Sequence, residues 1–242
     1  MRVSRLYVAA ALNVGGRLEL DEAAAHYVRS VLRLKQDQQI VLFNGQGGEY
    51  LARFSEVSRK TVRVEIEQFI DRDVESPMQI NLGLGISRGD RMDWAVQKAV
   101  ELGVTQLTPL VTERCVIKFS DDKKQQRLQH WQHIVQHAAE QSGRTCLPAL
   151  TEIATLPNWV AGQQGFRVFL DPYADQTLAD LVPENQQITL LSGPEGGFSE
   201  QERQIAKAAG FVPVRMGARI LRTETAVLSA LTAVQTLWGD FR

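Results

Sequence analysis

From Met78 to Trp238, short apolar runs alternate with segments of helical periodicity, and this alternation constrains the fold of the chain more than any other feature. Helices are predicted where apolar residues recur at spacings of three and four. Strands that alternate with helices form a mostly parallel sheet with helices on its faces, so this part of the chain is predicted to be an α/β domain. The predicted strands span residues 80–86, 107–111, 166–170, 188–191 and 212–216.

Several of the predicted helices have recognisable ends. Asp90 is expected to cap the first helix, which Gly103 closes. Ser199 and Glu202 have the spacing of a capping box. The last predicted helix, Glu224 to Trp238, is apolar over most of its surface. We therefore expect it to lie in the core or at a subunit interface.

The N-terminal part of the chain has a different pattern. Strands are predicted at residues 40–43, 50–57 and 61–66, with one helix over 21–34. This pattern is typical of a small β-barrel with a single helix. The charged stretch 71–77 ends in proline and is predicted to be a linker. The sequence thus predicts two domains, residues 1–73 and 74–242.

Two glycine-containing loops follow predicted strands, Ser192 to Phe198 and Met216 to Ala226. Open α/β sheets bind ligands at the carboxyl ends of their strands, so both loops are candidate walls of a binding site. Neither loop has the spacing of a Walker phosphate loop or of a dinucleotide-binding fingerprint. The sequence therefore predicts a ligand held mainly by backbone groups.

Arg222 is the least expected residue of the second loop. Thr223 as helix cap and Glu224 in the first turn would both stabilise the start of a helix. A cation at that position is electrostatically unfavourable, so capping does not account for Arg222. We expect it to contact a phosphate or a carboxylate.

Composition restricts the class of protein further. The net charge is −1, but residues 1–35 carry six basic and three acidic side chains, and residues 87–144 carry nine and seven. Mildly basic stretches thus alternate with acidic ones, as on ordinary surface or on a nucleic-acid-binding face.

His130, His133 and His137 lack the spacing of a zinc protease motif, and we expect no metal. Cys115 and Cys146 are predicted to be reduced, and the chain to be cytoplasmic without a membrane span.

Several motifs are distributed along nearly the whole chain. They are Ile86-Ser-Arg-Gly-Asp-Arg-Met92, Gln97-Lys-Ala-Val-Glu-Leu-Gly103, Thr108-Pro-Leu110, Glu113-Arg-Cys115, Ala139-Glu-Gln-Ser-Gly-Arg144, Gly193-Pro-Glu-Gly-Gly197 and Gly217-Ala-Arg-Ile-Leu-Arg-Thr-Glu-Thr-Ala226. Together with Arg2, Arg5 and the segment Tyr27 to Arg33, these motifs resemble those of the RsmE family, the 16S ribosomal RNA uridine-N3 methyltransferases of the SPOUT superfamily.

The resemblance implies a PUA-like RNA-binding barrel followed by a SPOUT α/β domain with a deep trefoil knot, in a homodimer. It implies S-adenosyl-L-methionine as cofactor and, as substrate, 16S rRNA within the small ribosomal subunit or a late precursor. The residues that it places at the cofactor are Phe169, Leu170, Leu191, Ser192, Gly193, Glu195, Gly196, Gly197, Met216, Gly217, Ile220, Leu221, Arg222 and Thr223.

Methyl transfer to a uracil N3 requires removal of the N3 proton and stabilisation of the developing anion. The candidate proton acceptors are Glu224 and Glu195, and the candidate cations are Arg222 and Arg144. A basic track is expected to bind the RNA backbone and leave the target base flipped outward. Its candidate residues are Arg2, Arg5, Arg29, Arg33, Lys35, Arg88, Lys98, Arg114 and Arg144.

Two alternatives remain open from the sequence. One is a SPOUT enzyme that methylates a ribose 2′-hydroxyl of tRNA or 23S RNA, and the other is an RNA-binding assembly factor without catalytic activity. The chain also departs from the pattern of the family that it resembles at Leu170-Asp-Pro172, where members often have Leu-His-Pro. The cofactor contacts of that loop are therefore the least defined.

Overall fold

A computed structural model describes residues 3–115 and 121–241, and within it the chain divides into two compact units. The first unit contains the chain up to Glu75 together with Ala139–Leu147. The second contains Ser76–Ala138 and Pro148 onward. The domain boundary predicted after residue 73 stays a prediction, and the return of residues 139–147 to the first unit was not expected from the sequence.

The first unit is built on a five-stranded sheet with the strand order β1-β3-β4-β5-β2. The strands are β1 (Arg5–Tyr7), β2 (Arg17–Glu19), β3 (Gln39–Phe43), β4 (Glu49–Val57) and β5 (Val62–Ile70). All pairs are antiparallel except β1 with β3. The predicted strands of this unit are confirmed, whereas β1 and β2 are too short to give a periodic signal.

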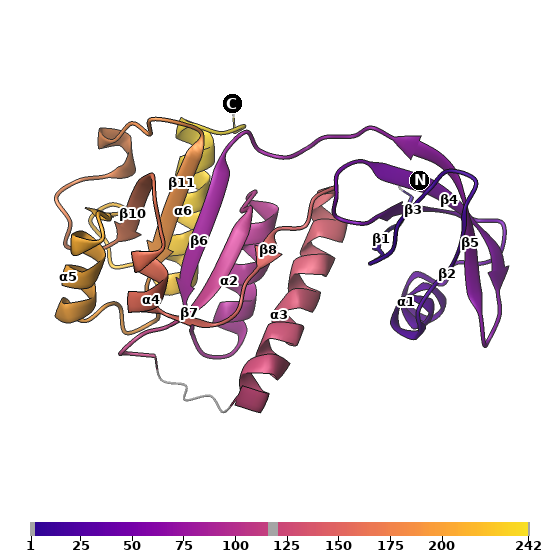
Figure 1. Ribbon diagram of the computed structural model, residues 1–242, viewed down its shortest axis with the longest axis horizontal. Coiled ribbons are helices and arrows are strands. Elements are labelled where there is room, and N and C mark those ends of the chain that lie inside the picture. The colour runs from indigo at the N-terminus through magenta and orange to yellow at the C-terminus, as the bar shows by residue number, and fades with distance from the viewer. Residues whose placement is uncertain (1–2, 116–120, 242) are drawn as a thin grey trace. The chain divides into compact units, whose positions relative to one another are not determined.

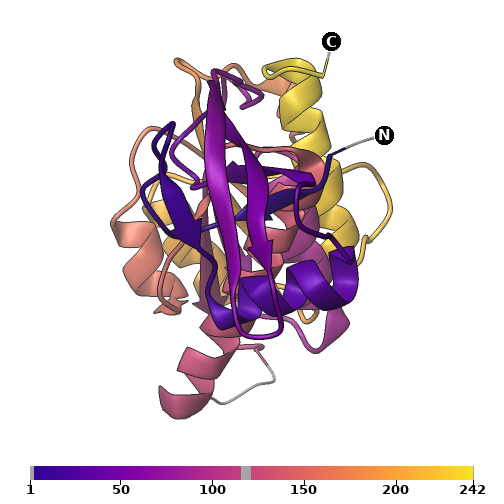
Figure 2. The same cartoon turned by 90° about the vertical axis from the view of Figure 1, so that its right-hand side faces the viewer.

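One helical segment lies across this sheet (Figure 2). It begins as α1 (Glu22–His26), capped by the Asp21 carboxylate, and continues as the π-helix η1 (Tyr27–Leu32). The sequence predicted a single regular helix here. The segment ends at Arg33, whose φ of 54° is left-handed. Its buried residues Ala25 and Val28 complete a core with Ile40, Leu42, Phe54, Val62 and Val64.

The second unit contains a seven-stranded sheet with the order β12-β10-β11-β6-β7-β8, and β9 also pairs with β7 (Figure 1). All of its strand pairs among the described residues are parallel, where the sequence predicted a mostly parallel sheet. The strands are β6 (Gln79–Gly85), β7 (Gln106–Val111), β8 (Ala149–Leu150), β9 (Ala154–Thr155), β10 (Phe166–Leu170), β11 (Gln187–Ser192) and β12 (Val212–Val214).

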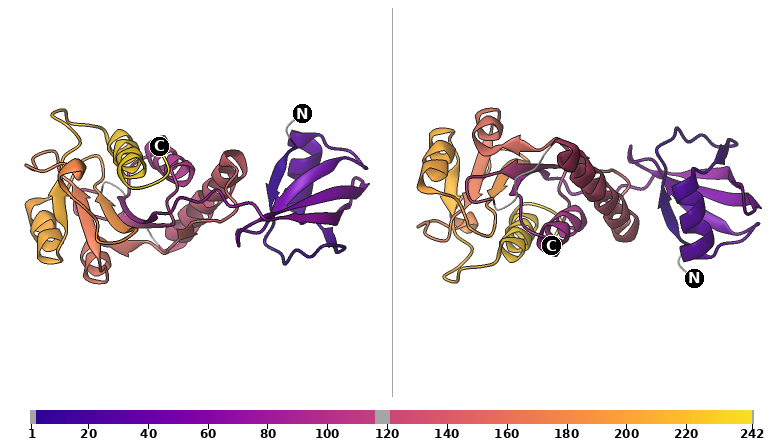
Figure 3. Two further views of the ribbon diagram at one scale, coloured as in Figure 1. Left: turned by 90° about the horizontal axis from the view of Figure 1, so that it is seen from above. Right: turned by 90° about the horizontal axis from the view of Figure 1, so that it is seen from below.

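Helices cover both faces of this sheet (Figure 3). On one face α2 packs against α6, and on the other α4 packs against α5 over a core that contains Trp159, Phe169, Leu191 and Phe211. The helices are α2 (Asp90–Glu101), α3 (Asp121–Ser142), α4 (Leu156–Ala161), the 3-10 turn η2 (Leu178–Asp180), α5 (Glu200–Ala208) and α6 (Thr223–Leu237). Among the described residues, no helix has both the length and the apolar composition of a membrane span.

Two predicted helix caps are wrong. Gly89 rather than Asp90 caps α2, since its φ of 55° and ψ of −140° suit glycine and leave Asp90 inside the first turn. Arg222 rather than Thr223 is the cap residue of α6, and its side chain makes no capping hydrogen bond. The capping box of Ser199 and Glu202 is confirmed.

Candidate functional site

A cavity of about 220 Å³ lies where three neighbouring strands of the second unit end. The last residues of β10, β11 and β12, which are Leu170, Ser192 and Val214, all line it. Parallel strands bring their carboxyl ends to one edge, so loops distant in sequence meet there. The other lining residues are Arg114, Asp171–Tyr173, Gly193–Phe198, Arg203, Met216, Arg219, Ile220, Leu221, Thr223 and Ala226.

The first predicted loop, Ser192 to Phe198, forms one wall. Its turn is closed by a hydrogen bond of 2.8 Å from the Gly197 N–H to the Pro194 carbonyl. Gly85 of β6 allows the loop to pack closely, because a Cβ there would lie 2.5 Å from the Pro194 nitrogen. The Ser192 to Phe198 loop thus lines the cavity along its whole length, while the backbone-held ligand expected from the sequence stays a prediction.

A buried carboxylate joins this wall to the segment after β7. Glu202 accepts hydrogen bonds from the backbone N–H groups of Ser199, at 2.9 Å, and Glu113, at 2.7 Å. The adjacent Arg114 donates to the Gly196 carbonyl at 2.9 Å. The capping box identified Glu202 from the sequence, but its bond to Glu113 depends on tertiary structure and had no local signal.

Glu195 lies in the same wall with its carboxylate already engaged. Its Oε1 accepts from the Arg91 guanidinium at 2.6 Å and from the Arg88 backbone N–H at 3.3 Å. This carboxylate therefore holds the segment before α2 against the cavity wall.

The second predicted loop forms the opposite wall and separates the cavity from a more apolar groove. Met216 lines both hollows. Thr223 lines the cavity, whereas the next residue, Glu224, lines the groove. Glu224 Oε2 is buried and has no hydrogen-bond partner among the described residues. The rest of the groove is formed by Trp94, Thr177–Ala179, Arg215, Gly217, Thr225, Leu228, Ser229, Thr232, Ala233, Thr236 and Leu237.

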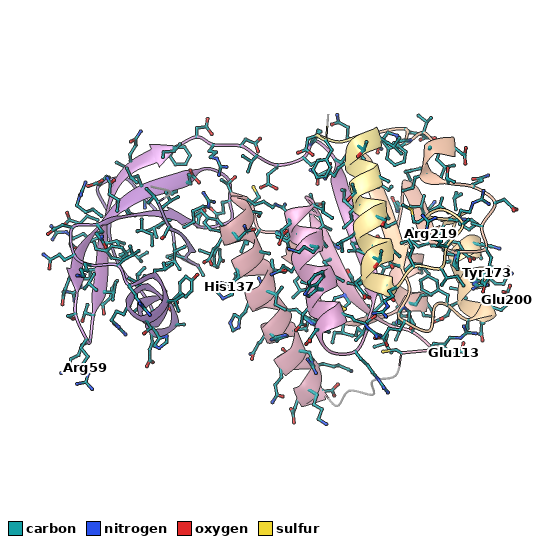
Figure 4. The ribbon with its side chains drawn as sticks, turned by 180° about the vertical axis from the view of Figure 1, so that it is seen from behind. Arg59, Glu113, His137, Tyr173, Glu200 and Arg219 are labelled. Carbon is teal, nitrogen blue, oxygen red and sulfur yellow. The ribbon has the colours of Figure 1, made fainter. Side chains whose placement is uncertain are left out.

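Most residues expected at the cofactor line the cavity, but four do not. Phe169 and Leu191 are fully buried in the core behind it. Gly217 lines the groove, and Arg222 is exposed beside the two hollows without lining either. Tyr173 and Arg203 line the cavity although the sequence did not nominate them. Asp171, which was noted from the sequence only as a departure from the family pattern, and Arg219 of the second predicted loop line it too; Figure 4 labels Tyr173 and Arg219 in this part of the second unit.

The four catalytic candidates have different surroundings. Glu195 lines the cavity, Glu224 lines the groove, and Arg222 is exposed at the start of α6. Arg144 belongs to the first unit and is 5% exposed. Its Nε lies 2.9 Å from the Glu75 carboxylate, which also accepts from the Thr145 and Cys146 backbone N–H groups. This environment favours a structural role for Arg144.

Arg5 also lies within the first unit, and its side chain is only 8% exposed. It pairs with Glu49, donates to the Arg144 carbonyl at 2.9 Å and lies 4.8 Å from the centre of the Phe43 ring. Its contacts anchor the segment 139–147 rather than offer a free charge to RNA.

Burial and the Glu75 carboxylate raise the pKa of the neighbouring Cys146 thiol above its ordinary value.

The other basic candidates differ in exposure. Arg33 and Lys35 are exposed in the first unit, where Arg29 is half-buried and donates to the Ser58 carbonyl. In the second unit Arg88 and Arg114 are exposed, while Lys98 pairs with Glu101 at 2.7 Å. Arg2 lies outside the described residues.

The described residues contain no group of three or more His, Cys, Asp or Glu side chains placed to hold a metal ion. Of the helix histidines, His130 instead contacts Asp93 at 2.7 Å. Trp131, on the same helix, is buried and donates to the other Asp93 oxygen.

Comparison with known families agrees with this fold. A family model described as an RNA methyltransferase domain matches residues 74–235, and one described as an RNA methyltransferase PUA domain matches residues 20–67. The chain thus belongs to the RNA methyltransferase class.

The relatives narrow the class to one family. A Buchnera aphidicola protein named ribosomal RNA small subunit methyltransferase E is 32% identical, over 99% of this chain and 98% of its own length. The chain belongs to the ribosomal RNA small subunit methyltransferase E family.

Solved structures of relatives have the same fold throughout. The Neisseria gonorrhoeae ribosomal RNA small subunit methyltransferase E, bound to S-adenosyl methionine, is 38% identical, with 100% of both chains covered and a TM-score of 0.93. A Legionella pneumophila methyltransferase in complex with the same cofactor is 37% identical, with 100% of both chains covered and a TM-score of 0.97.

Proposed function

We propose that this protein methylates N3 of a specific uridine in the 16S RNA of the small ribosomal subunit, with S-adenosylmethionine as the methyl donor. The observation that carries the proposal is the cavity at the ends of β10, β11 and β12, in a chain that matches cofactor-bound members of its family over its full length.

The residues of the cavity suit this cofactor. Apolar side chains such as Leu170, Val214, Ile220 and Leu221 can contact the adenine ring, and the backbone of the Ser192 to Phe198 wall offers hydrogen bonds to its polar edge. The bound cofactor supplies an activated methyl group on a sulfonium. The protein is left to align the acceptor nitrogen and to remove its proton.

We assign proton removal to Glu224 in preference to Glu195. Glu195 is held by Arg91 and the Arg88 backbone, whereas one Glu224 oxygen has no partner within the described structure. The Arg222 cation, two residues away, would stabilise the uracil anion as the proton leaves.

Glu224→Gln tests this assignment, with Glu195→Gln as its counterpart. If Glu224 is the acceptor, its variant loses about 10²- to 10⁴-fold in kcat at unchanged cofactor affinity, which is the usual contribution of general base catalysis. Raising the pH should recover part of the loss, since the N3 position then ionises without help. A wild-type rate in Glu224→Gln with a large loss in Glu195→Gln would exchange the two roles.

The RNA is proposed to contact basic residues of both units, the exposed Arg33 and Lys35 with the half-buried Arg29 in the first and the exposed Arg88 and Arg114 in the second. A charge reversal at one of them should weaken RNA binding and reduce its salt dependence while cofactor affinity stays the same. Equal RNA binding by variant and wild type at every salt concentration would contradict this.

A homodimer is part of the proposal, with the groove along α6 as the contact surface. The groove is predominantly apolar and includes Trp94, which is 57% exposed, and Leu237. An exposed apolar groove of this kind is typical of a protein interface.

The trefoil knot that the family resemblance implies also belongs to the proposal, with the loops after β10, β11 and β12 as its parts.

Nucleoside mass spectrometry of ribosomal RNA from a deletion strain tests the reaction. Loss of 3-methyluridine from 16S RNA, restored by the wild-type gene, is expected. Loss of a 2′-O-methyl nucleoside instead would favour a ribose methyltransferase.

Titration calorimetry with S-adenosylmethionine is expected to show binding, and the absence of heat would favour an RNA-binding protein without catalytic activity.

A further inference from the structure

The loop after β10 places a buried carboxylate in the wall of the cavity. Asp171 follows the last residue of β10, and its backbone N–H donates to the Val214 carbonyl at 2.9 Å, which continues the pairing of β10 with β12. The residue is 6% exposed and lines the cavity. Its position is thus fixed by the sheet, and its side chain is directed to the site rather than to bulk solvent.

The hydrogen bonds of this carboxylate are incomplete. Oδ1 accepts from the Tyr173 backbone N–H at 3.0 Å. Oδ2 lies 3.6 Å from Arg203 Nε, which is beyond hydrogen-bond distance, and that nitrogen is itself buried without a hydrogen-bond partner. An ionised carboxylate can accept about four hydrogen bonds. Neither Asp171 oxygen is among the fully buried atoms without a partner, so the free acceptor positions remain accessible from the cavity that the residue lines, and this group is suited to accept donors from a ligand there.

The neighbouring charge restricts which donors fit. The Arg203 guanidinium lies beside the carboxylate and 5.3 Å from the centre of the Tyr173 ring. A cationic donor that approached Asp171 would therefore be repelled by Arg203, whereas a neutral hydroxyl would not. Two adjacent hydroxyls can also share one carboxylate, because each oxygen has two acceptor positions.

We propose that Asp171 is a specificity residue that accepts hydrogen bonds from the ribose hydroxyls of the adenosyl cofactor. The inference rests on the proposed function, since it assumes that this cavity holds that cofactor. Arg203 acts as a positioning residue, which orients the Asp171 side chain between the loop and α5.

Titration calorimetry with cofactor analogues tests the assignment. S-adenosylhomocysteine is compared with its 2′-deoxy and 3′-deoxy forms on the wild type, Asp171→Asn and Asp171→Ala. Hydrogen bonds to charged groups contribute enough that loss of a recognised hydroxyl should weaken wild-type binding roughly 10- to 100-fold. In Asp171→Ala the same loss should shrink to about threefold or less, because the partner is gone. Asp171→Asn, which keeps an acceptor for Tyr173 N–H, should fall between them.

Two further analogues test whether Asp171 instead accepts hydrogen bonds from the adenine amino group or from the amino-acid end of the cofactor. S-inosylhomocysteine lacks the adenine amino group, and 5′-methylthioadenosine lacks the amino-acid end. The effect of Asp171→Ala should be the same for these ligands as for S-adenosylhomocysteine. If the effect disappears with either one, Asp171 binds that part of the molecule and the ribose assignment is overturned.

Glu200→Gln is the matched control, since Glu200 is the other acid near Arg203, at 3.9 Å, and its side chain is 71% exposed. It should bind all the analogues as the wild type does. Wild-type protein that binds both deoxy forms as tightly as the parent compound overturns the inference without any variant. Wild-type protein that binds none of these ligands contradicts the proposed function itself.

Discussion

At the scale of single residues, the side chains with no role in packing are the most informative. Arg222 is exposed, makes no capping hydrogen bond and stands at the positive end of α6. Sequence reasoning singled it out for that reason. Arg5 and Arg144 were nominated with it because they are basic and match family motifs, but the structure buries both against carboxylates. Charge can be read from a sequence, whereas the partner of a charge cannot.

Arg222→Ala should separate catalysis from stability. Because the side chain caps nothing and is exposed, we expect the free energy of unfolding to change by less than about 0.5 kcal/mol. Loss of a cation that stabilises the developing anion should lower kcat by about 10²- to 10³-fold. Single-turnover methylation of ribosomal subunits, beside a urea denaturation curve, measures both. The assignment fails if the folded variant reacts at the wild-type rate, and Arg222→Lys should recover part of the activity.

Cys146 should be an unreactive thiol in the folded protein. Burial and the nearby Glu75 carboxylate raise its pKa, so its thiolate fraction at pH 8.5 is lower than in the unfolded chain. Alkylation by iodoacetamide at that pH, followed by mass spectrometry of the Cys146 peptide, should be slower in the native protein than in urea. Glu75→Gln removes one cause of the shift and should speed the reaction, and equal rates in all three samples would contradict the argument.

At the scale of elements, the strands and helices were mostly predictable and their caps were less so. The strands β6, β7, β10 and β11 have continuous apolar runs, and α2 and α5 have clear helical periodicity, so local sequence suffices for them. The cap residues of α2 and α6 depend on one backbone conformation each, which periodicity does not encode. The short β1, β2, β8 and β9 owe their existence to neighbours in the sheet.

At the start of α5, the buried Glu202 carboxylate joins the helix to the cavity wall and to the segment after β7. Glu202→Ala would leave the Ser199 and Glu113 backbone N–H groups without their buried acceptor. We expect a loss of about 2–4 kcal/mol in the free energy of unfolding. Glu200→Ala, an exposed acid in the same turn, should change it by less than about 0.5 kcal/mol. Urea denaturation measures the free energy of unfolding of both variants. Equal losses would show that the buried hydrogen bonds accepted by Glu202 do not stabilise the fold.

At the scale of the whole molecule, the two units are predicted from different patterns in the sequence. The periodicity of two in the first unit and the strand-helix alternation in the second were both visible. The segment 139–147 was not assigned to the first unit, because it is continuous in sequence with α3 of the second. It is held there by contacts of Glu75 and Arg5 with Arg144, which join positions far apart in the chain.

The proposed homodimer gives the prediction at this scale. Trp94→Glu puts a charge into the groove along α6, and burying an unpaired charge in an interface is costly. We expect the variant to sediment as a monomer at concentrations where the wild type is a dimer. Val182→Glu is the control, since Val182 is 84% exposed and lies outside the groove lining. A variant that stays dimeric would place the interface elsewhere.

The sequence by itself determined the α/β class, the parallel sheet, the two glycine-containing loops and the family, because these depend on local periodicity and on contiguous motifs. Only the tertiary structure decided which side chains share a surface. It set Asp171 and Arg203 in the cavity, Glu224 in the adjoining groove, and Arg5 and Arg144 in buried ion pairs. The physical reason is that a polar group acquires its role from the partners and burial that folding gives it, and those come from residues distant in the chain.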